Sequence, residues 1–245
     1  MGATKIEFQL RVWIMWAIVV LGFWAPWIER LGIGRRISLL EWLALDLSRT
    51  GIVSFAAASP LVIVAAILVA AASVVLRVWG TAYLGPFTVT HAKMQAGALL
   101  ADGPYRHVRN PLYLGSWCLF AAMAFAMPAT GALFAMVLLT VFLLRLILGE
   151  EAFLSGELGE PYQEYLRAVP RLFPRLRGSL KPSGRKPQWA RAMVAEINPL
   201  GVLLILAVLA WRYDNWLLVK AMIINFGLTL VVRAMTMEPR TASTN

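Results

Sequence analysis

The sequence predicts an all-α fold, a polytopic helical membrane protein with about six transmembrane segments and a polar cap on one face of the membrane. Hydrophobic residues make up 60% of the 245 residues, the mean hydropathy is +0.69, and the apolar residues form long runs. The net charge is +10, but the basic residues lie between the apolar runs, as in the cytoplasmic loops of membrane proteins. We therefore expect this chain to contact membrane lipids and not nucleic acid.

The first third of the chain contains two apolar spans separated by an amphipathic segment. Residues 8–28 are long enough to cross about 30 Å of hydrocarbon, and they lack a small-residue cleavage site, so we expect a retained span. Residues 29–51 mix charged residues with leucines, which predicts a short interfacial helix. Residues 52–78 form the next span, in which Pro60 is tolerated near one end and Arg77 can extend to the interface.

A long loop and a helical hairpin follow. The loop over residues 80–110 is long enough to fold over the membrane face as a cap. The apolar runs 112–127 and 131–148 are joined by a tight turn, so the hairpin returns the chain to the face it left. The cap loop and the segment after Gly149 should therefore share one membrane face.

The last third is basic and then apolar. Residues 150–197 carry many arginines and lysines, and an amphipathic helix is expected over residues 154–169, where Gly159 and Pro161 can interrupt it. Two further apolar runs cover residues 199–211 and 216–232. Six spans would place both termini on the same side of the membrane. Because the basic loops also lie on that side, we expect both termini and the cap in the cytoplasm.

Two polar blocks carry the functional signal. Leu99 to Gly115 reads L-L-A-D-G-P-Y-R-H-V-R-N-P-L-Y-L-G, and a second block from Glu150 to Pro174 fits the pattern E-E-x-x-L-x-x-x-x-G-x-x-Y-x-x-Y-x-x-x-V-P-R-x-x-P. In this order, with a helical hairpin between them, the blocks resemble the isoprenylcysteine carboxyl methyltransferases and phospholipid methyltransferases. Those are integral membrane enzymes that use S-adenosyl-L-methionine. The resemblance covers about residues 80–176.

The resemblance implies a cofactor-binding cap. Asn110 stands where the family usually has histidine, and its amide can form hydrogen bonds but cannot be protonated. His107, three residues earlier, is either a substitute for that histidine or a loop residue facing phosphate groups. Carried over position by position, the residues expected to bind S-adenosylmethionine are Leu99, Leu100, Tyr105, Asn110, Pro111, Leu112, Tyr113 and Glu150.

Glu150 and Glu151 stand at the predicted end of a transmembrane helix, where the helix dipole disfavours negative charge. An acidic pair there needs a cationic partner. The ammonium and sulfonium of the methyl donor are candidates, and the alternatives are solvation by the cytosol or bridges to Arg106, Arg109 or Arg171. We assign a catalytic and cofactor-binding role to Glu150 and a structural role to Glu151.

Arg145 is the second catalytic candidate. It lies within an apolar run, its helical neighbours are uncharged, and an intramembrane arginine is often functional. The family has a substrate-orienting arginine just before its acidic pair, and here the offset from Glu150 is one residue longer. If Arg145 binds the substrate, methylation of a carboxylate oxygen is favoured. If its side chain only extends to the membrane interface, Arg145 gives no indication of the acceptor.

The expected function is therefore methyl transfer from S-adenosylmethionine to a lipidic or prenylated acceptor at the cytoplasmic membrane boundary. Alternatives are an amine or phospholipid N-methyltransferase, an NADPH-dependent membrane sterol or enone reductase, and a non-catalytic lipid-binding protein. The reductases typically carry an acid shortly after the Tyr-x-Gly segment, where this chain has Ser116 and Trp117. With one cysteine, Cys118, and no metal-binding motif, no metal is expected.

The chain is expected to comprise three parts. Residues 1–79 would form the N-terminal transmembrane helices and the interfacial helix, 80–176 the methyltransferase core, and 177–245 a basic linker with a C-terminal helical hairpin.

Overall fold

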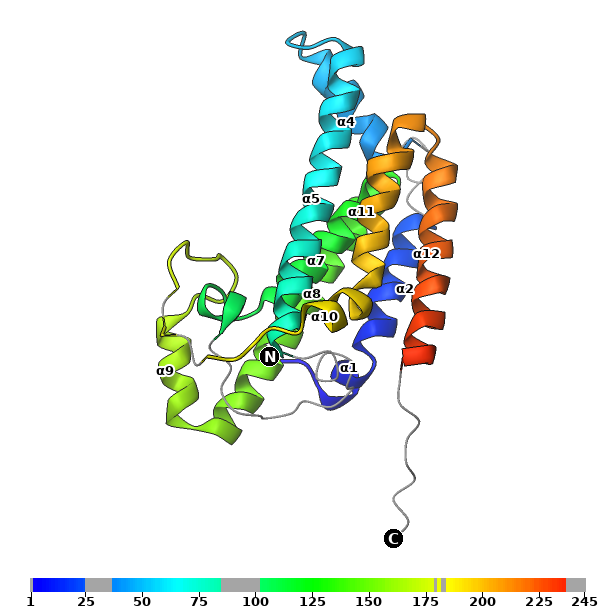
Figure 1. Ribbon diagram of the computed structural model, residues 1–245. Coiled ribbons are helices and arrows are strands. Elements are labelled where there is room, and N and C mark those ends of the chain that lie inside the picture. The colour runs from blue at the N-terminus through cyan, green and yellow to red at the C-terminus, as the bar shows by residue number, and fades with distance from the viewer. Residues whose placement is uncertain (1, 25–36, 85–101, 179, 182–183, 237–245) are drawn as a thin grey trace.

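The structure is a bundle of helices that lie side by side (Figure 1). It is a computed structural model that describes residues 2–24, 37–84, 102–178, 180–181 and 184–236. Every named element in these ranges is a helix, which confirms the predicted all-α class. The elements are α1 (Lys5–Gln9), α2 (Arg11–Phe23), α4 (Leu39–Arg49), α5 (Phe55–Leu84), η1 (Gly103–Arg106), α7 (Pro111–Ala124), α8 (Ala129–Leu158), α9 (Glu160–Ala168), α10 (Trp189–Ala195), α11 (Ile197–Leu209), η2 (Ala210–Arg212) and α12 (Asn215–Thr236).

The predicted count of six spans is not confirmed. Among the described residues, three helices are long and apolar enough to cross a membrane, namely α5, α8 and α12, with 30, 30 and 22 residues. A fourth crossing results if Trp189–Ala195 and Ile197–Arg212, bent by 70°, form one broken span. The apolar helices α2 and α7 have only 13 and 14 residues. At about 1.5 Å per residue they fall short of about 30 Å of hydrocarbon. The long apolar helices fit an integral membrane protein.

Helices α5, α7 and α8 alternate in direction, which brings the polar blocks to one end of the bundle (Figure 1). The start of α4 packs at the far end, where the backbone amide of Leu39 donates to the Met127 carbonyl between α7 and α8 over 2.7 Å. Ser38 and Glu41 form a capping box that explains why α4 begins there. The N-terminal segment and the last turn of α12 lie at the opposite end, together with α9 (Figure 1).

Helix α8 is longer than predicted. The expected helix over residues 131–148 continues to Leu158, so the prediction that Glu150 and Glu151 end the helix is wrong. The sequence after Glu151 remains compatible with a helix, and Leu154 and Leu158 pack against a small core under α9. The helix ends at Gly159, whose φ of 62° is a conformation that glycine adopts readily. This glycine divides the predicted amphipathic helix over residues 154–169, and α9 begins directly after it.

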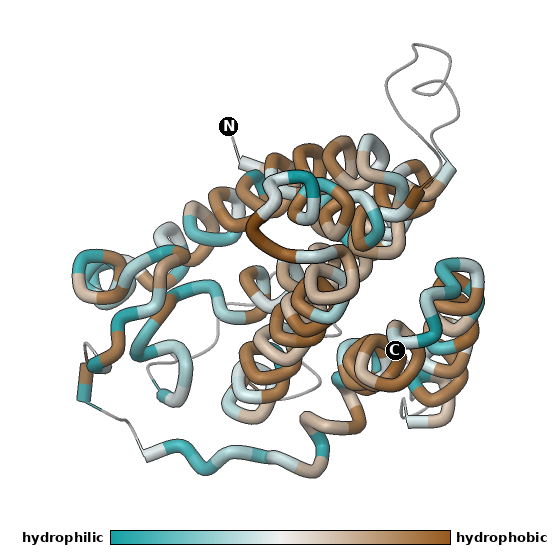
Figure 2. Tube along the Cα trace, turned by 90° about the horizontal axis from the view of Figure 1, so that it is seen from above, coloured by the Kyte–Doolittle hydropathy of each residue, from teal (hydrophilic) through white to brown (hydrophobic). Residues whose placement is uncertain are grey.

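The two polar blocks do share one end of the bundle, as predicted. The backbone amide of Arg109 donates to the Pro170 carbonyl over 2.9 Å, and that of Arg175 donates to the His107 carbonyl over 3.0 Å. Figure 2 shows hydrophobic residues along the long helices, and hydrophilic residues gathered in α9 and in the segment between α9 and α10. The polar cap is therefore built from both blocks.

Candidate functional site

The first turn of α7 and the C-terminal third of α8 bring together one tyrosine and one glutamate. Pro111 occupies the first position of α7, as predicted, where its missing amide hydrogen costs no hydrogen bond. Two residues later, the Tyr113 hydroxyl donates to Glu150 Oε2 over 2.7 Å. Both side chains are half-buried. This hydrogen bond therefore joins the first polar block, through Tyr113, to the second, through Glu150.

The N-terminal segment lies against the same part of α8. The backbone amide of Ala3 donates to the Arg145 carbonyl over 2.8 Å. A Cβ on Gly149 would lie only 3.0 Å from the backbone of Ala3, so any larger residue immediately before Glu150 would have to displace the N-terminal segment slightly. Arg11, at the start of α2, is close enough to interact electrostatically with Glu150.

Glu151 has different surroundings from its neighbour. Its carboxylate pairs with Arg109 Nη1 at 3.2 Å and with Arg171 Nη2 at 2.7 Å, and it accepts a hydrogen bond from Asn110 Nδ2 over 3.2 Å. The Glu151 side chain is only 8% exposed. The hydrogen bond with Glu151 raises the pKa of Arg171. Glu151 therefore ties the start of α7 and the segment after α9 to α8, in agreement with a structural role.

Asn110 and His107 both take part in contacts within the cap. The Asn110 amide also donates to the Arg171 carbonyl over 3.3 Å. His107 Nδ1 lies 2.8 Å from the Arg175 carbonyl oxygen, and its ring lies 5.7 Å from that of Trp79. Contact of either side chain with a methyl donor stays a prediction.

Tyr105 is buried beneath the cap. Its hydroxyl donates to the Gly80 carbonyl over 3.5 Å, while its own carbonyl accepts a hydrogen bond from the Tyr165 hydroxyl over 2.9 Å. Burial raises the pKa of both hydroxyls, so they remain protonated donors. Leu112 lies in the first turn of α7, next to Tyr113. Leu99 and Leu100 lie outside the described residues.

Arg145 is not directed towards Glu150. Five residues separate the two positions on α8, which corresponds to about 140° around the helix axis. Arg145 Nη2 lies 2.9 Å from both carboxylate oxygens of Glu7 on α1. The structure therefore places Arg145 beside the N-terminal segment rather than beside Tyr113.

One buried ion pair was missed by the sequence interpretation. Arg77 does not extend to the interface as predicted, because its guanidinium pairs with Glu196, with Nε and Oε2 at 2.6 Å. Glu196, at the junction of α10 and α11, is 1% exposed. The sequence offered one signal for this pair: Arg77 and Glu196 have opposite charges, and each lies next to an apolar run.

The comparisons with known proteins identify one family. Residues 53–160 match the family model described as phospholipid methyltransferase. The match extends from the residues before α5 to the first residue of α9, so it includes Tyr113 and Glu150. No curated protein and no solved structure matches the chain.

Proposed function

Residues 53–160 belong to the phospholipid methyltransferase family of membrane enzymes, and we propose that the chain transfers the methyl group of S-adenosylmethionine to the head group of a lipidic or prenylated acceptor. We place the reaction at the cytoplasmic boundary of the membrane, where a soluble donor and a membrane-embedded acceptor can meet. The hydrogen-bonded pair of Tyr113 and Glu150 carries this proposal.

Glu150 has the chemistry that a cationic donor requires. Its carboxylate receives a hydrogen bond from a neutral phenol, whereas Glu151 beside it pairs with two arginines. Although Arg11 also interacts electrostatically with Glu150, a half-buried carboxylate can accept further charge-assisted hydrogen bonds from an ammonium. We propose that Glu150 and Tyr113 contact the donor, and that Asn110, Pro111, Leu112 and Tyr105 hold the turn that presents Tyr113.

The donor supplies an activated methyl group, which leaves sulfur for an acceptor lone pair in an in-line displacement. The residues of this chain then need to hold the donor, orient the acceptor and exclude water. Because the cap and α8 are joined through Glu151, the two polar blocks can enclose the donor from opposite sides.

Calorimetric titration of the purified protein tests the proposal. We expect binding of S-adenosylhomocysteine, the demethylated product, and no binding of NADPH. Binding of NADPH without S-adenosylhomocysteine would assign the chain to the reductases instead. If neither binds, the alternative of a non-catalytic lipid-binding protein is favoured.

Replacing Tyr113 by Phe should weaken binding of S-adenosylhomocysteine by about fivefold, because one hydrogen bond contributes about 1 kcal/mol. The melting temperature should change little, since the phenyl ring keeps its packing. Titration and thermal unfolding in detergent check both expectations. A lower melting temperature with unchanged affinity would make Tyr113 a structural residue.

For the acceptor, we propose that Arg145 holds a carboxylate. In the structure its guanidinium already pairs with one carboxylate, that of Glu7, and both side chains are partly exposed. An acceptor carboxylate could replace Glu7 there, whereas an amine would be repelled by the guanidinium. This favours methylation of oxygen over methylation of nitrogen.

Arg145→Gln should therefore lower the methylation rate by about tenfold or more, equivalent to about 1.4 kcal/mol, while binding of S-adenosylhomocysteine is retained. Arg167→Gln is the control, because Arg167 also pairs with a glutamate but lies exposed on α9. Membranes are supplied with methyl-labelled donor and then treated with mild base, which releases methanol from esters. Label that survives base would show N-methylation. That result would contradict the carboxylate proposal but not the proposal of methyl transfer.

A further inference from the structure

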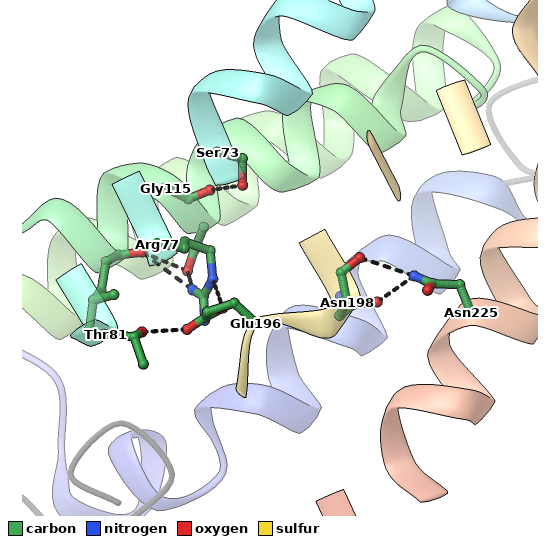
Figure 3. Close-up of polar contacts among 9 residues, drawn as sticks. Ser73, Arg77, Thr81, Gly115, Glu196, Asn198 and Asn225 are labelled. Atoms are coloured by element: carbon green, nitrogen blue, oxygen red, sulfur yellow. Dashed lines mark hydrogen bonds and ion pairs between the residues drawn. The ribbon is translucent and has the colours of Figure 1, made fainter. Parts of the chain in front are cut away.

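The C-terminal helices reach the proposed site through a buried polar cluster. Figure 3 shows Glu196, which precedes α11, facing Arg77 and Thr81 of α5. Arg77 donates from Nε to Glu196 Oε2 over 2.6 Å and from Nη2 to Oε1 over 3.0 Å. The Thr81 hydroxyl donates to Oε1 over 2.6 Å. Glu196 lies outside residues 53–160, so the family match does not include this carboxylate.

The remaining nitrogen of the same guanidinium contacts α7. Arg77 Nη1 donates to Ser116 Oγ over 2.6 Å and lies 3.5 Å from the Leu112 carbonyl oxygen. The Ser116 hydroxyl in turn donates to the Leu112 carbonyl over 2.9 Å. Leu112 directly precedes Tyr113, whose hydroxyl contacts Glu150. A continuous set of contacts therefore joins Glu196 to the proposed donor site.

From these contacts we infer that Glu196 is a positioning residue for the methyl-donor site, acting through Arg77 on the first turn of α7. This inference rests on the proposed function. The two-point contact with Glu196 fixes the plane of the guanidinium, and that orientation directs Nη1 at α7. Without the carboxylate, the guanidinium is an uncompensated buried charge and must turn towards other acceptors.

A purely structural role would be to attach the C-terminal hairpin to the bundle. The hairpin has its own polar contact for comparison, in which Asn225 Nδ2 donates to Asn198 Oδ1 over 2.9 Å and to its carbonyl over 3.1 Å (Figure 3). This contact joins α11 to α12 and does not reach α7. Asn225→Ala therefore disturbs the hairpin without disturbing the turn that carries Tyr113.

The experiment measures the affinity for S-adenosylhomocysteine and the melting temperature of the full-length protein in detergent. Glu196→Gln should weaken binding by about fivefold or more, which is the effect expected within one hydrogen-bond network. Ser116→Ala leaves the ion pair of Arg77 and Glu196 intact and should also weaken binding of S-adenosylhomocysteine. This second variant keeps the inference testable if Glu196→Gln does not fold. Ser73→Ala is its matched control, because the Ser73 hydroxyl donates to the Gly115 carbonyl at the same helix interface over 2.8 Å.

A double-mutant cycle with Tyr113→Phe tests whether Glu196 acts through that turn. If it does, adding Glu196→Gln to Tyr113→Phe costs less affinity than Glu196→Gln costs alone. Additive losses, or equal losses in Asn225→Ala and Glu196→Gln, would overturn the inference. Absence of binding in the wild-type protein would instead contradict the proposed function itself.

Discussion

Replacing Glu150 by Gln is expected to weaken binding of S-adenosylhomocysteine by about tenfold or more. A hydrogen bond to a charged group contributes about 1.5 to 3 kcal/mol, and glutamine keeps the size of the side chain while removing its charge. Because the methyl donor carries a sulfonium as well as an ammonium, its affinity should fall at least as far as that of the product. Calorimetric titration with both compounds gives the two losses separately.

Glu157→Gln is the matched control for this prediction. Glu157 lies on the same helix but is exposed, so the same change from glutamate to glutamine is made there away from the proposed site. It should leave both affinities and the melting temperature unchanged. If Glu150→Gln binds the product as tightly as Glu157→Gln does, the assignment of Glu150 to the donor site fails.

Several helices could be predicted because their apolar runs and end signals are local features of the sequence. The apolar runs matched α5 and α8, and Pro111 and Gly159 marked a helix start and a helix end. The end of α8 was misplaced because the apolar run stops near Leu148, whereas the helix does not. Its last turns are amphipathic and depend on packing against α9, which hydropathy alone does not reveal.

The central contact of the candidate site connects the two motif blocks. The sequence interpretation assigned Tyr113 and Glu150 to one cofactor site, and the structure brings their side chains to 2.7 Å. That result follows from the hairpin, since a helical return between the blocks must bring their ends to the same face. Binding of a donor by these two residues stays a prediction.

Arg109 and Arg171, which pair with Glu151, were among the partners expected from the sequence, but the partners of Arg145 and Arg77 could not be predicted. Arg145 pairs with Glu7, 138 residues away in the sequence, and Arg77 pairs with Glu196, 119 residues away. Both pairs depend on how separate helices pack, and the sequence of one helix alone does not show its partner. An isolated arginine in an apolar run therefore indicates that a partner is needed, but not which residue provides it.

The largest effect on stability is expected at Glu151. Its carboxylate is nearly buried and holds two arginines, one of which, Arg109, is also largely buried with an exposure of 13%. Removing one partner of a buried ion pair costs about 3 to 5 kcal/mol, because the opposite charge is left without compensation. Glu151→Gln should lower the melting temperature markedly and loosen the contact between the cap and α8.

Glu160→Gln provides the comparison, since Glu160 also pairs with an arginine but is 68% exposed, and exposed pairs contribute about 0 to 1 kcal/mol. Thermal unfolding in detergent should separate the two variants clearly. Limited proteolysis should cut Glu151→Gln faster in residues 170–178, because Arg171 loses the carboxylate that joins this segment to α8. Equal melting temperatures for the two variants would show that Glu151 does not hold the cap. The two polar blocks would then be joined by their other contacts, which include the backbone hydrogen bonds of Arg109 and Arg175 and the hydrogen bond from the Tyr165 hydroxyl to the Tyr105 carbonyl.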